Sequence, residues 1–268
     1  MAKPRVLVLT GYGINCDYEA EYGFNLAGGT AERVHINSLI AGEKKISDYQ
    51  IFVFPGGFSF GDDIASGKIL AVKSKIKLGD ELRAFIEKGG LIIGICNGFQ
   101  VVAKFGLLSD QPATSFDQRL TVTFNDSGRF EDRWIWLKRV SKHCVWTDDI
   151  EGIYLPIAHG EGKFFAPPEI IKSLETNKQV AFAYVRPDGA AANGEYPLNP
   201  NGSLNDIAGI CDPSGKVLGM MPHPERFLTF YNHPEWTRIK EEMKRKGLPV
   251  PEEGEGLKIL RNGVKYFS

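Results

Sequence analysis

The chain has 268 residues, of which 43% are hydrophobic and 24% charged, and its formal net charge is −1. This composition is typical of a soluble globular protein, and the balanced charge gives no reason to expect nucleic acid or an anionic membrane as a partner. No apolar run approaches the roughly 20 residues that a membrane span needs, and the first residues lead directly into a strand, so no signal peptide is expected.

The first hundred or so residues alternate strands with helices. Residues 5–10 form a β-branched apolar run, which predicts a central parallel strand, and Asp17 is a candidate N-cap for a helix over residues 18–27. Further strands are predicted at residues 31–36, 51–54 and 91–95. Residues 82–88 are predicted to belong to a helix that ends at Gly89-Gly90, and another helix is predicted at residues 99–105. This close alternation indicates right-handed βαβ units, hence an α/β fold with a mostly parallel sheet covered by helices on both faces.

The pattern changes after Leu108. Antiparallel strands are predicted at residues 120–124, 133–140 and 144–147, which indicates an antiparallel excursion added to the parallel sheet. A strand at 153–159, a helix at 168–175 and a strand at 179–185 follow, and residues 186–203 form a long polar loop. The last two predicted strands cover residues 207–211 and 217–221.

The C-terminal residues have a different character. Residues 234–246 predict a charged helix, supported by Glu241–Arg245 and Glu242–Lys246 pairs and otherwise a solvated helix face. After a linker at 249–254, apolar residues at helical spacing predict a final short helix that docks on the main body: Leu257, Leu260 and Val264. We therefore expect a main domain of residues 1–230 and a C-terminal helical extension of residues 231–268.

Four cysteines are scattered along the chain at Cys16, Cys96, Cys144 and Cys211. None is part of a C-x-x-C pair, so the pattern indicates neither a metal site nor a redox dithiol, and a reduced protein of the cytoplasm is expected. Cys96 follows a predicted buried strand and is flanked by glycines in the pattern Gly94-x-Cys96-x-Gly98. Such a strand-to-helix turn needs small residues and points the helix N-terminus at the nucleophile, which favours a thiolate. A structural cysteine at the end of a core strand is the alternative.

A cysteine nucleophile needs a base, and the base needs a group that orients it. His159 and His223 both follow predicted strands. His223 lies between the stiffening prolines Pro222 and Pro224 and is followed two residues later by the carboxylate of Glu225. For the oxyanion, the backbone N–H of Asn97 follows the nucleophile directly. A second donor is expected from Pro55-Gly56-Gly57, although that segment taken alone favours an ordinary β-to-α turn.

Together these residues resemble the class I (triad) glutamine amidotransferases, over about residues 4–230. Six motifs narrow the resemblance to the glutaminase subunits of phosphoribosylformylglycinamidine synthases. They are Gly13-Ile14-Asn15-Cys16-Asp17, Phe54-Pro55-Gly56-Gly57-Phe58-Ser59-Phe60-Gly61-Asp62, Gly94-Ile95-Cys96-Asn97-Gly98-Phe99-Gln100, Ala158-His159-Gly160-Glu161-Gly162, Asn199-Pro200-Asn201-Gly202-Ser203 and Gly219-Met220-Met221-Pro222-His223-Pro224-Glu225-Arg226.

The resemblance implies a class I glutamine amidotransferase fold, which has a flavodoxin-like, mostly parallel sheet with helices on both faces and an antiparallel excursion. It also implies a role for each site residue. Cys96 would attack the side-chain amide of L-glutamine, His223 would move a proton to the leaving ammonia, and Glu225 would orient His223. The N–H groups of Gly57 and Asn97 would hold the oxyanion. The substrate would be contacted by Gln100, His159, Gly160 and Gly162.

The resemblance also implies what lies outside this chain. Ammonia would pass to a large synthetase subunit that makes formylglycinamidine ribonucleotide from formylglycinamide ribonucleotide in purine biosynthesis. ATP and magnesium would bind on that partner, and this chain would carry no cofactor, which agrees with the lack of a Gly-rich Lys-Ser/Thr phosphate loop in the sequence. The need for a small third subunit is left open.

Two other functions are considered. A cysteine hydrolase or chaperone of the related flavodoxin-like elbow group typically has histidine directly after the cysteine, where this chain has Asn97. A non-catalytic regulatory subunit is expected to have lost a triad member, yet Cys96, His223 and Glu225 are all present.

Overall fold

The structure, a computed structural model, describes residues 3–268. Nine strands form one sheet in the order β2-β1-β3-β4-β11-β10-β9-β6-β7, and two short strands, β5 and β8, form a second sheet. The strands are β1 Arg5–Thr10, β2 Thr30–His35, β3 Ile51–Phe54, β4 Leu91–Ile95, β5 Thr121–Thr123, β6 Glu131–Arg139, β7 Gly152–His159, β8 Lys163–Phe165, β9 Val180–Val185, β10 Ile207–Cys211 and β11 Val217–Met220.

The large sheet has a parallel half and an antiparallel half. Strands β2, β1, β3, β4 and β11 pair in parallel, whereas β11, β10, β9, β6 and β7 pair antiparallel. All residues of β3, β4 and β11 are buried, as expected for parallel strands covered on both faces. The predicted α/β fold, with a flavodoxin-like parallel sheet and an antiparallel excursion, is confirmed.

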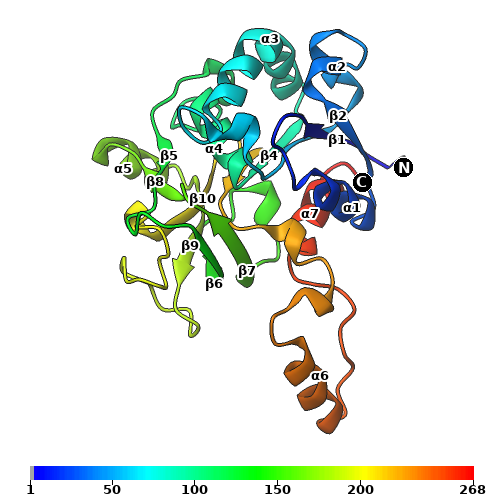
Figure 1. Ribbon diagram of the computed structural model, residues 1–268, viewed down its shortest axis with the longest axis vertical. Coiled ribbons are helices and arrows are strands. Elements are labelled where there is room, and N and C mark those ends of the chain that lie inside the picture. Colours follow the sequence, from blue (N-terminus) through cyan, green and yellow to red (C-terminus); the bar gives the residue numbers. More distant parts are fainter. Residues whose placement is uncertain (1–2) are drawn as a thin grey trace.

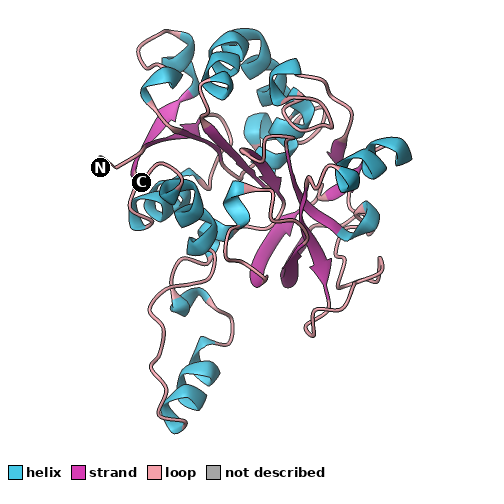
Figure 2. Cartoon of the chain, turned by 180° about the vertical axis from the view of Figure 1, so that it is seen from behind, coloured by secondary structure: helices cyan, strands magenta, loops and turns pink. Residues whose placement is uncertain are grey.

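Helices cover both faces of the parallel half (Figure 1). Helices α3 and α4 pack together on one face, and α1 and α7 pack together on the other, as Figure 2 shows from behind. Among residues 3–268, none of the helices has the length and apolar character that a membrane crossing requires. The helices are α1 Asp17–Leu26, α2 Ile36–Ile40, α3 Lys68–Glu87, α4 Asn97–Phe105, α5 Pro168–Thr176, α6 Trp236–Arg245 and α7 Leu257–Lys265.

The C-terminal residues divide into an arm and a docked helix. Helix α6, none of whose residues is buried, lies on an arm that projects from the body (Figure 1). Helix α7 returns to the body, and the predicted docking of its apolar residues is confirmed, because Leu257 and Leu260 are fully buried and Val264 is 5% exposed. The division of the chain at residue 230 stays a prediction.

On α6, one of the two predicted charge pairs forms as expected. Glu241 and Arg245 lie 2.9 Å apart. Glu242 is paired with Arg238 at 2.6 Å, whereas the sequence predicts Lys246 as its partner. Both observed pairs link residues one helical turn apart on an exposed helix, so each contributes only about 0.3–0.5 kcal/mol.

Two local predictions are wrong. Asp17 lies inside α1 rather than at its N-cap, which is Cys16, and its carboxylate instead lies 3.6 Å from the Arg33 guanidinium. Residues 144–147, predicted as a strand, contain the 3-10 helix Val145–Thr147, and Trp146 within it is fully buried. Residues 82–88 lie at the end of helix α3 as predicted, and the start of this helix at Lys68 was not predicted. Strand β8 has no counterpart among the predicted elements.

Candidate active site

Three neighbouring parallel strands end at the same edge of the sheet. Strand β4 lies between β3 and β11, and all three run in the same direction. Gly57 comes shortly after β3, Cys96 directly after β4 and His223 shortly after β11. The carboxyl ends of parallel strands form the ligand-binding crevice in α/β sheets, so the sheet itself brings these three residues together.

Cys96 lies on the sharp turn that its flanking glycines predict. Its φ and ψ are 53° and −107°, and α4 begins at the next residue. A Cβ on Gly98 would lie 1.8 Å from the Phe54 carbonyl oxygen, and a Cβ on Gly94 would lie 2.5 Å from the Gly98 oxygen. Because the turn presses these backbones together, only glycine fits at either position. Because Cys96 is the N-cap residue of α4, its side chain lies at the positive end of the helix dipole.

The close approach at Gly98 gives a stability prediction. Gly98→Ala is expected to destabilise the protein by about 3 kcal/mol or more, because the added methyl group overlaps the fixed Phe54 carbonyl. Gly79→Ala is the matched control: its Cβ would meet Phe116 at an ordinary 3.5 Å inside α3, where alanine is the better helix former. Urea unfolding checks both, and a Gly98→Ala protein as stable as the wild type would contradict this account of the turn.

His223 and Glu225 form a buried pair beside the cysteine. His223 Nδ1 lies 2.5 Å from Glu225 Oε1, and the side chains are 1% and 0% exposed. Burial alone would lower the pKa of His223, but the Glu225 carboxylate and the Cys96 sulfur outweigh it and hold that pKa well above its usual value. His223 Nε2 has no hydrogen-bond partner among residues 3–268. The imidazole is thus held in a protonated form with one nitrogen free.

A second cysteine lies against this pair, and the sequence reasoning did not place it there. Sulfur of Cys16 lies within 4.8 Å of ligand atoms of His223 and Glu225, a group that could hold a metal ion. However, Arg226 Nη2 lies 3.1 Å from the same sulfur, so a positive charge already occupies the position of a cation. In the sequence, the only sign that Cys16 belongs to the site was its place in the Gly13-Ile14-Asn15-Cys16-Asp17 motif.

A cleft of about 270 Å³ opens above the cysteine. It is lined by these sequence-predicted residues, among others: Gly57, Cys96, Gln100, His159 and Gly160. The remaining predicted residues lie buried behind its wall: Asn97, Gly162, His223 and Glu225. Another cavity, of about 450 Å³, borders Gln50 and Gly90 at the amino ends of β3 and β4. That is the edge of the sheet opposite to the cysteine, so the smaller cleft, which Cys96 lines, is the candidate active site.

The local backbone pairing leaves the N–H groups of the two predicted oxyanion donors unused. Gly57 pairs with Ile14 in an isolated antiparallel bridge, and the hydrogen bond that closes the bridge runs from Phe58 N to Gly13 O (2.8 Å). Gly57 therefore occupies the non-hydrogen-bonded position, whose own N–H points away from Ile14. The N–H of Asn97 belongs to the first turn of α4, which lacks intrahelical acceptors.

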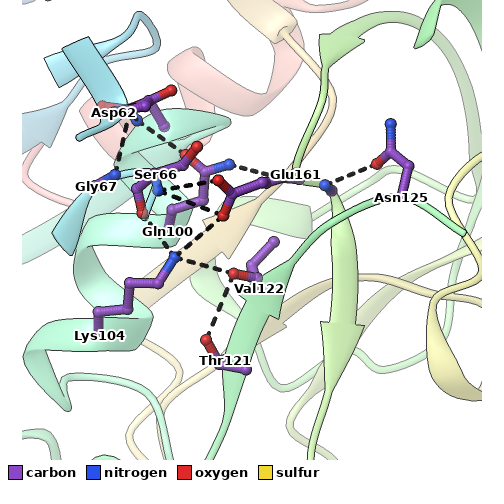
Figure 3. Close-up of polar contacts among 11 residues, drawn as sticks. Asp62, Ser66, Gly67, Gln100, Lys104, Thr121, Val122, Asn125 and Glu161 are labelled. Carbon is purple, nitrogen blue, oxygen red and sulfur yellow. Dashed lines mark hydrogen bonds and ion pairs between the residues drawn. The ribbon is translucent and has the colours of Figure 1, made fainter. Parts of the chain in front are cut away.

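Side-chain hydrogen bonds join the first turns of α4, directly after Cys96, to the loop that follows β7 on the other side of the cleft. Asn97 Nδ2 donates to Gln100 Oε1 (2.9 Å) and to Asp62 Oδ1 (3.0 Å). Gln100 Nε2 in turn donates to the carbonyl of Glu161 (2.5 Å), as Figure 3 shows. Gln100 is 3% exposed, so this chain of amides fixes the orientation of its side chain at the cleft.

Hydrogen bonds with two buried asparagines fix the loop that follows β7. His159 Nδ1 lies 3.1 Å from Asn125 Oδ1, which also accepts from Gly162 N (2.9 Å). Burial and the nearby His223 lower the pKa of His159 to about 3, so this imidazole is neutral. Asn201 Nδ2 donates to Gly162 O (2.8 Å), which explains the Asn199-Pro200-Asn201-Gly202-Ser203 motif as a support for this loop.

Comparison with known proteins places the chain in a family. The family model of the CobB/CobQ-like glutamine amidotransferase domain matches residues 3–267. The phosphoribosylformylglycinamidine synthase subunit PurQ of Methanococcus maripaludis is 49% identical over 267 residues, which cover 99% of this chain and 98% of that protein. This chain belongs to the PurQ family. The PurQ subunit of Dehalococcoides mccartyi is 47% identical over 268 residues, with 99% and 98% coverage.

Solved structures show the same relationship. A chain in a structure of PurLQS from Thermotoga maritima is 28% identical, with a TM-score of 0.72 and complete coverage of both chains. A glutamine amidotransferase from Thermotoga maritima shares the fold alone, with a TM-score of 0.54, 18% identity, and coverage of 99% and 98%. The predicted resemblance to the glutaminase subunits is thereby confirmed.

Proposed function

We propose that this PurQ family member is the glutaminase subunit of phosphoribosylformylglycinamidine synthase, with Cys96, His223 and Glu225 as its catalytic residues. The observation that carries the proposal is the convergence of a strained cysteine elbow with a buried His–Glu pair at one edge of the sheet. A protonated imidazole beside a sulfur at a helix N-terminus is the arrangement that activates a thiolate nucleophile.

The reaction follows from this geometry. The Cys96 thiolate attacks the side-chain amide carbon of L-glutamine, and the N–H groups of Gly57 and Asn97 hold the oxyanion. His223 donates its proton to the amide nitrogen as the C–N bond breaks, which releases ammonia and leaves a thioester. Water, deprotonated by His223, then attacks the thioester and releases glutamate. Glu225 keeps the Nδ1 side of His223 oriented throughout.

Substrate contacts follow from the residues around the cleft. Gln100, His159 and Gly160 line it, so we propose that they contact glutamine directly. Gly162 plays a supporting part, because a Cβ there would lie 2.2 Å from His159 Cε1, and only glycine lets the ring of His159 pack in this position. The neutral state of His159 leaves one ring nitrogen able to accept a hydrogen bond.

The relatives indicate where the ammonia goes. We propose a large synthetase subunit as the acceptor, which binds ATP and magnesium and makes formylglycinamidine ribonucleotide from formylglycinamide ribonucleotide. The likeness to a chain of PurLQS supports both this partner and a small third subunit. A cytoplasmic location is part of the same proposal, and the four unpaired cysteines among the described residues support it.

The alternatives have less support. Cys16 also lies beside His223, but it is fully buried, whereas Cys96 lines the cleft. A hydrolase or chaperone of the elbow group, and a regulatory subunit without catalysis, leave the His223–Glu225 pair unexplained.

A glutamine-dependent assay tests the proposed function. The chain is mixed with its synthetase partner, ATP, magnesium and formylglycinamide ribonucleotide, and glutamate and amidine product are measured with and without the partner. Equal formation of glutamate and product is expected in the complex. A complex that uses ammonia but not glutamine would overturn the proposal.

A further inference from the structure

A buried lysine lies behind the glutamine cleft, and the proposed chemistry does not use it. Lys104, near the end of α4, is 8% exposed, and its Nζ donates to the carbonyls of Ser66 (2.6 Å) and Val122 (3.0 Å). The same Nζ lies 3.8 Å from the Glu161 carboxylate, which is also buried (Figure 3). The charged pair therefore joins α4 to two loops that border the cleft.

Glu161 and Lys104 together bind both backbone polar groups of Ser66. The Glu161 carboxylate accepts from Ser66 N at 3.1 and 3.3 Å, while Lys104 binds Ser66 O, so both backbone groups of Ser66 are held. The backbone carbonyl of Glu161 accepts from Gln100. One residue thus links the Ser66 loop to the side chain proposed to contact glutamine.

The loop between Gly57 and Gly67, which this pair contacts, has an unfavourable backbone conformation that requires outside support. Between Gly57 and Gly67, three residues other than glycine have left-handed backbones: Phe60 (φ 55°), Asp62 (φ 53°) and Ile64 (φ 72°). Such conformations are unfavourable for these residues, above all for a β-branched isoleucine, and persist only where the surroundings impose them. Ile64 is 88% exposed, so its own side chain does not impose this conformation, and the loop is held at other points, among them Ser66.

The pair is poorly explained as a source of stability. Burial lowers the pKa of Lys104, against the opposing pull of Glu161 and Asp62, so the folded protein disfavours the ammonium form. Buried ion pairs are often no more stabilising than apolar residues of the same volume, because desolvation offsets their attraction. What such a pair does provide is directional hydrogen bonding at fixed positions, here on both sides of one peptide segment.

We propose that Lys104 and Glu161 are positioning residues for glutamine recognition, which clamp the loop of residues 58–67 against α4 and the loop after β7. The clamp fixes the cleft wall formed by Asp62 and Ser66 and, through the Glu161 carbonyl, the Gln100 side chain. This inference rests on the proposed glutaminase function. Neither residue takes part in the bond-breaking steps.

The double variant Lys104→Met/Glu161→Gln tests the clamp, because it leaves no unpaired buried charge and keeps the Glu161 backbone carbonyl. In the complex with the synthetase partner, we expect the KM for glutamine to rise about 10- to 100-fold, as displaced binding groups do. Synthesis supported by ammonia should be unchanged. The matched control is Lys75→Met, which removes an ammonium that binds the Phe116 carbonyl (2.8 Å) outside the cleft and should leave the KM unchanged.

Two further measurements separate positioning from a merely structural role. Labelling of Cys96 by a diazoketone analogue of glutamine should slow in the double variant, whereas labelling by iodoacetamide, which needs no recognition, should not. Because the pair acts as a unit, the single variant Lys104→Met should raise the KM about as much as the double variant does.

The outcomes distinguish this inference from the proposed function. A double variant with wild-type KM and wild-type diazoketone labelling would overturn the clamp, whether or not its thermal midpoint falls. A lowered midpoint with unchanged KM would assign the pair a structural role only. If the wild-type complex itself fails to use glutamine, the proposed function fails instead, whatever the variants do.

Discussion

Cys96→Ala is expected to abolish glutamine-supported synthesis by the complex and to leave ammonia-supported synthesis intact. Removal of a covalent nucleophile lowers turnover by about 10⁴-fold or more, because the residues that remain can only bind and polarise the amide. The synthetase reaction with free ammonia does not pass through this cleft chemistry. Product formation with each nitrogen source, measured on the same complex, gives the two rates directly.

A matched control removes a thiol elsewhere. Cys211, in β10, is fully buried and lies outside the cleft, so Cys211→Ala should retain glutamine turnover. Turnover with glutamine in the Cys96→Ala complex would mean that another residue is the nucleophile. Cys16, beside His223, would then be the first candidate to test.

The parallel half of the fold could be predicted because its signals are local. Strands β1, β3 and β4 have the predicted bounds, since each is a short apolar run between turn residues. The βαβ alternation also predicts that parallel strands end at one edge of the sheet, but it did not predict the strand order that places β4 between β3 and β11. The cysteine elbow was equally local, because its glycines lie within two positions of Cys96.

The failed predictions depend on contacts that are distant in sequence. Trp146 is buried against α7, where a Cβ on Gly263 would lie 2.3 Å from its ring, so a residue 117 positions away decides the local backbone. The start of helix α3 at Lys68 was not predicted, because Ser74 and Gly79 lie on its buried face and interrupt the apolar pattern. Propensity and periodicity cannot report either effect.

In the site, too, features with a local sequence signal could be predicted and features that depend on distant contacts could not. Residues with a chemical signature, such as His223 and Glu225, could be proposed from their spacing. Lys104 could not, because a single lysine near the end of a predicted helix is normally solvated. Its burial arises only when Glu161, 57 residues further on, is brought against it.

Glu225→Gln is expected to have the second large effect, through His223. The substitution keeps a hydrogen-bond acceptor within reach of Nδ1 but removes the negative charge 2.5 Å away. Burial, which opposes protonation, is then countered mainly by the cysteine sulfurs nearby, so the pKa of His223 should fall. Glutamine turnover should drop about 10²- to 10⁴-fold, by analogy with loss of the orienting carboxylate in a triad.

The pH dependence gives this prediction its sharpest test. Iodoacetamide alkylation of Cys96 should be slower at neutral pH in Glu225→Gln than in the wild type, because the protonated imidazole that favours the thiolate is lost. The raised pKa of His223 also means that the pair stabilises the fold below pH 6.5 and that this contribution is lost as pH rises through the raised pKa. Glu225→Gln should therefore be most destabilising in acid.

Glu253→Gln is the control for Glu225→Gln, since it removes an exposed carboxylate that lies 2.7 Å from the Arg261 guanidinium. It should change neither alkylation nor turnover, because an exposed ion pair contributes little and lies outside the cleft. If alkylation of Cys96 has the same pH profile in Glu225→Gln as in the wild type, then Glu225 does not control the protonation of His223. The buried carboxylate would in that case act only by fixing the position of the imidazole ring.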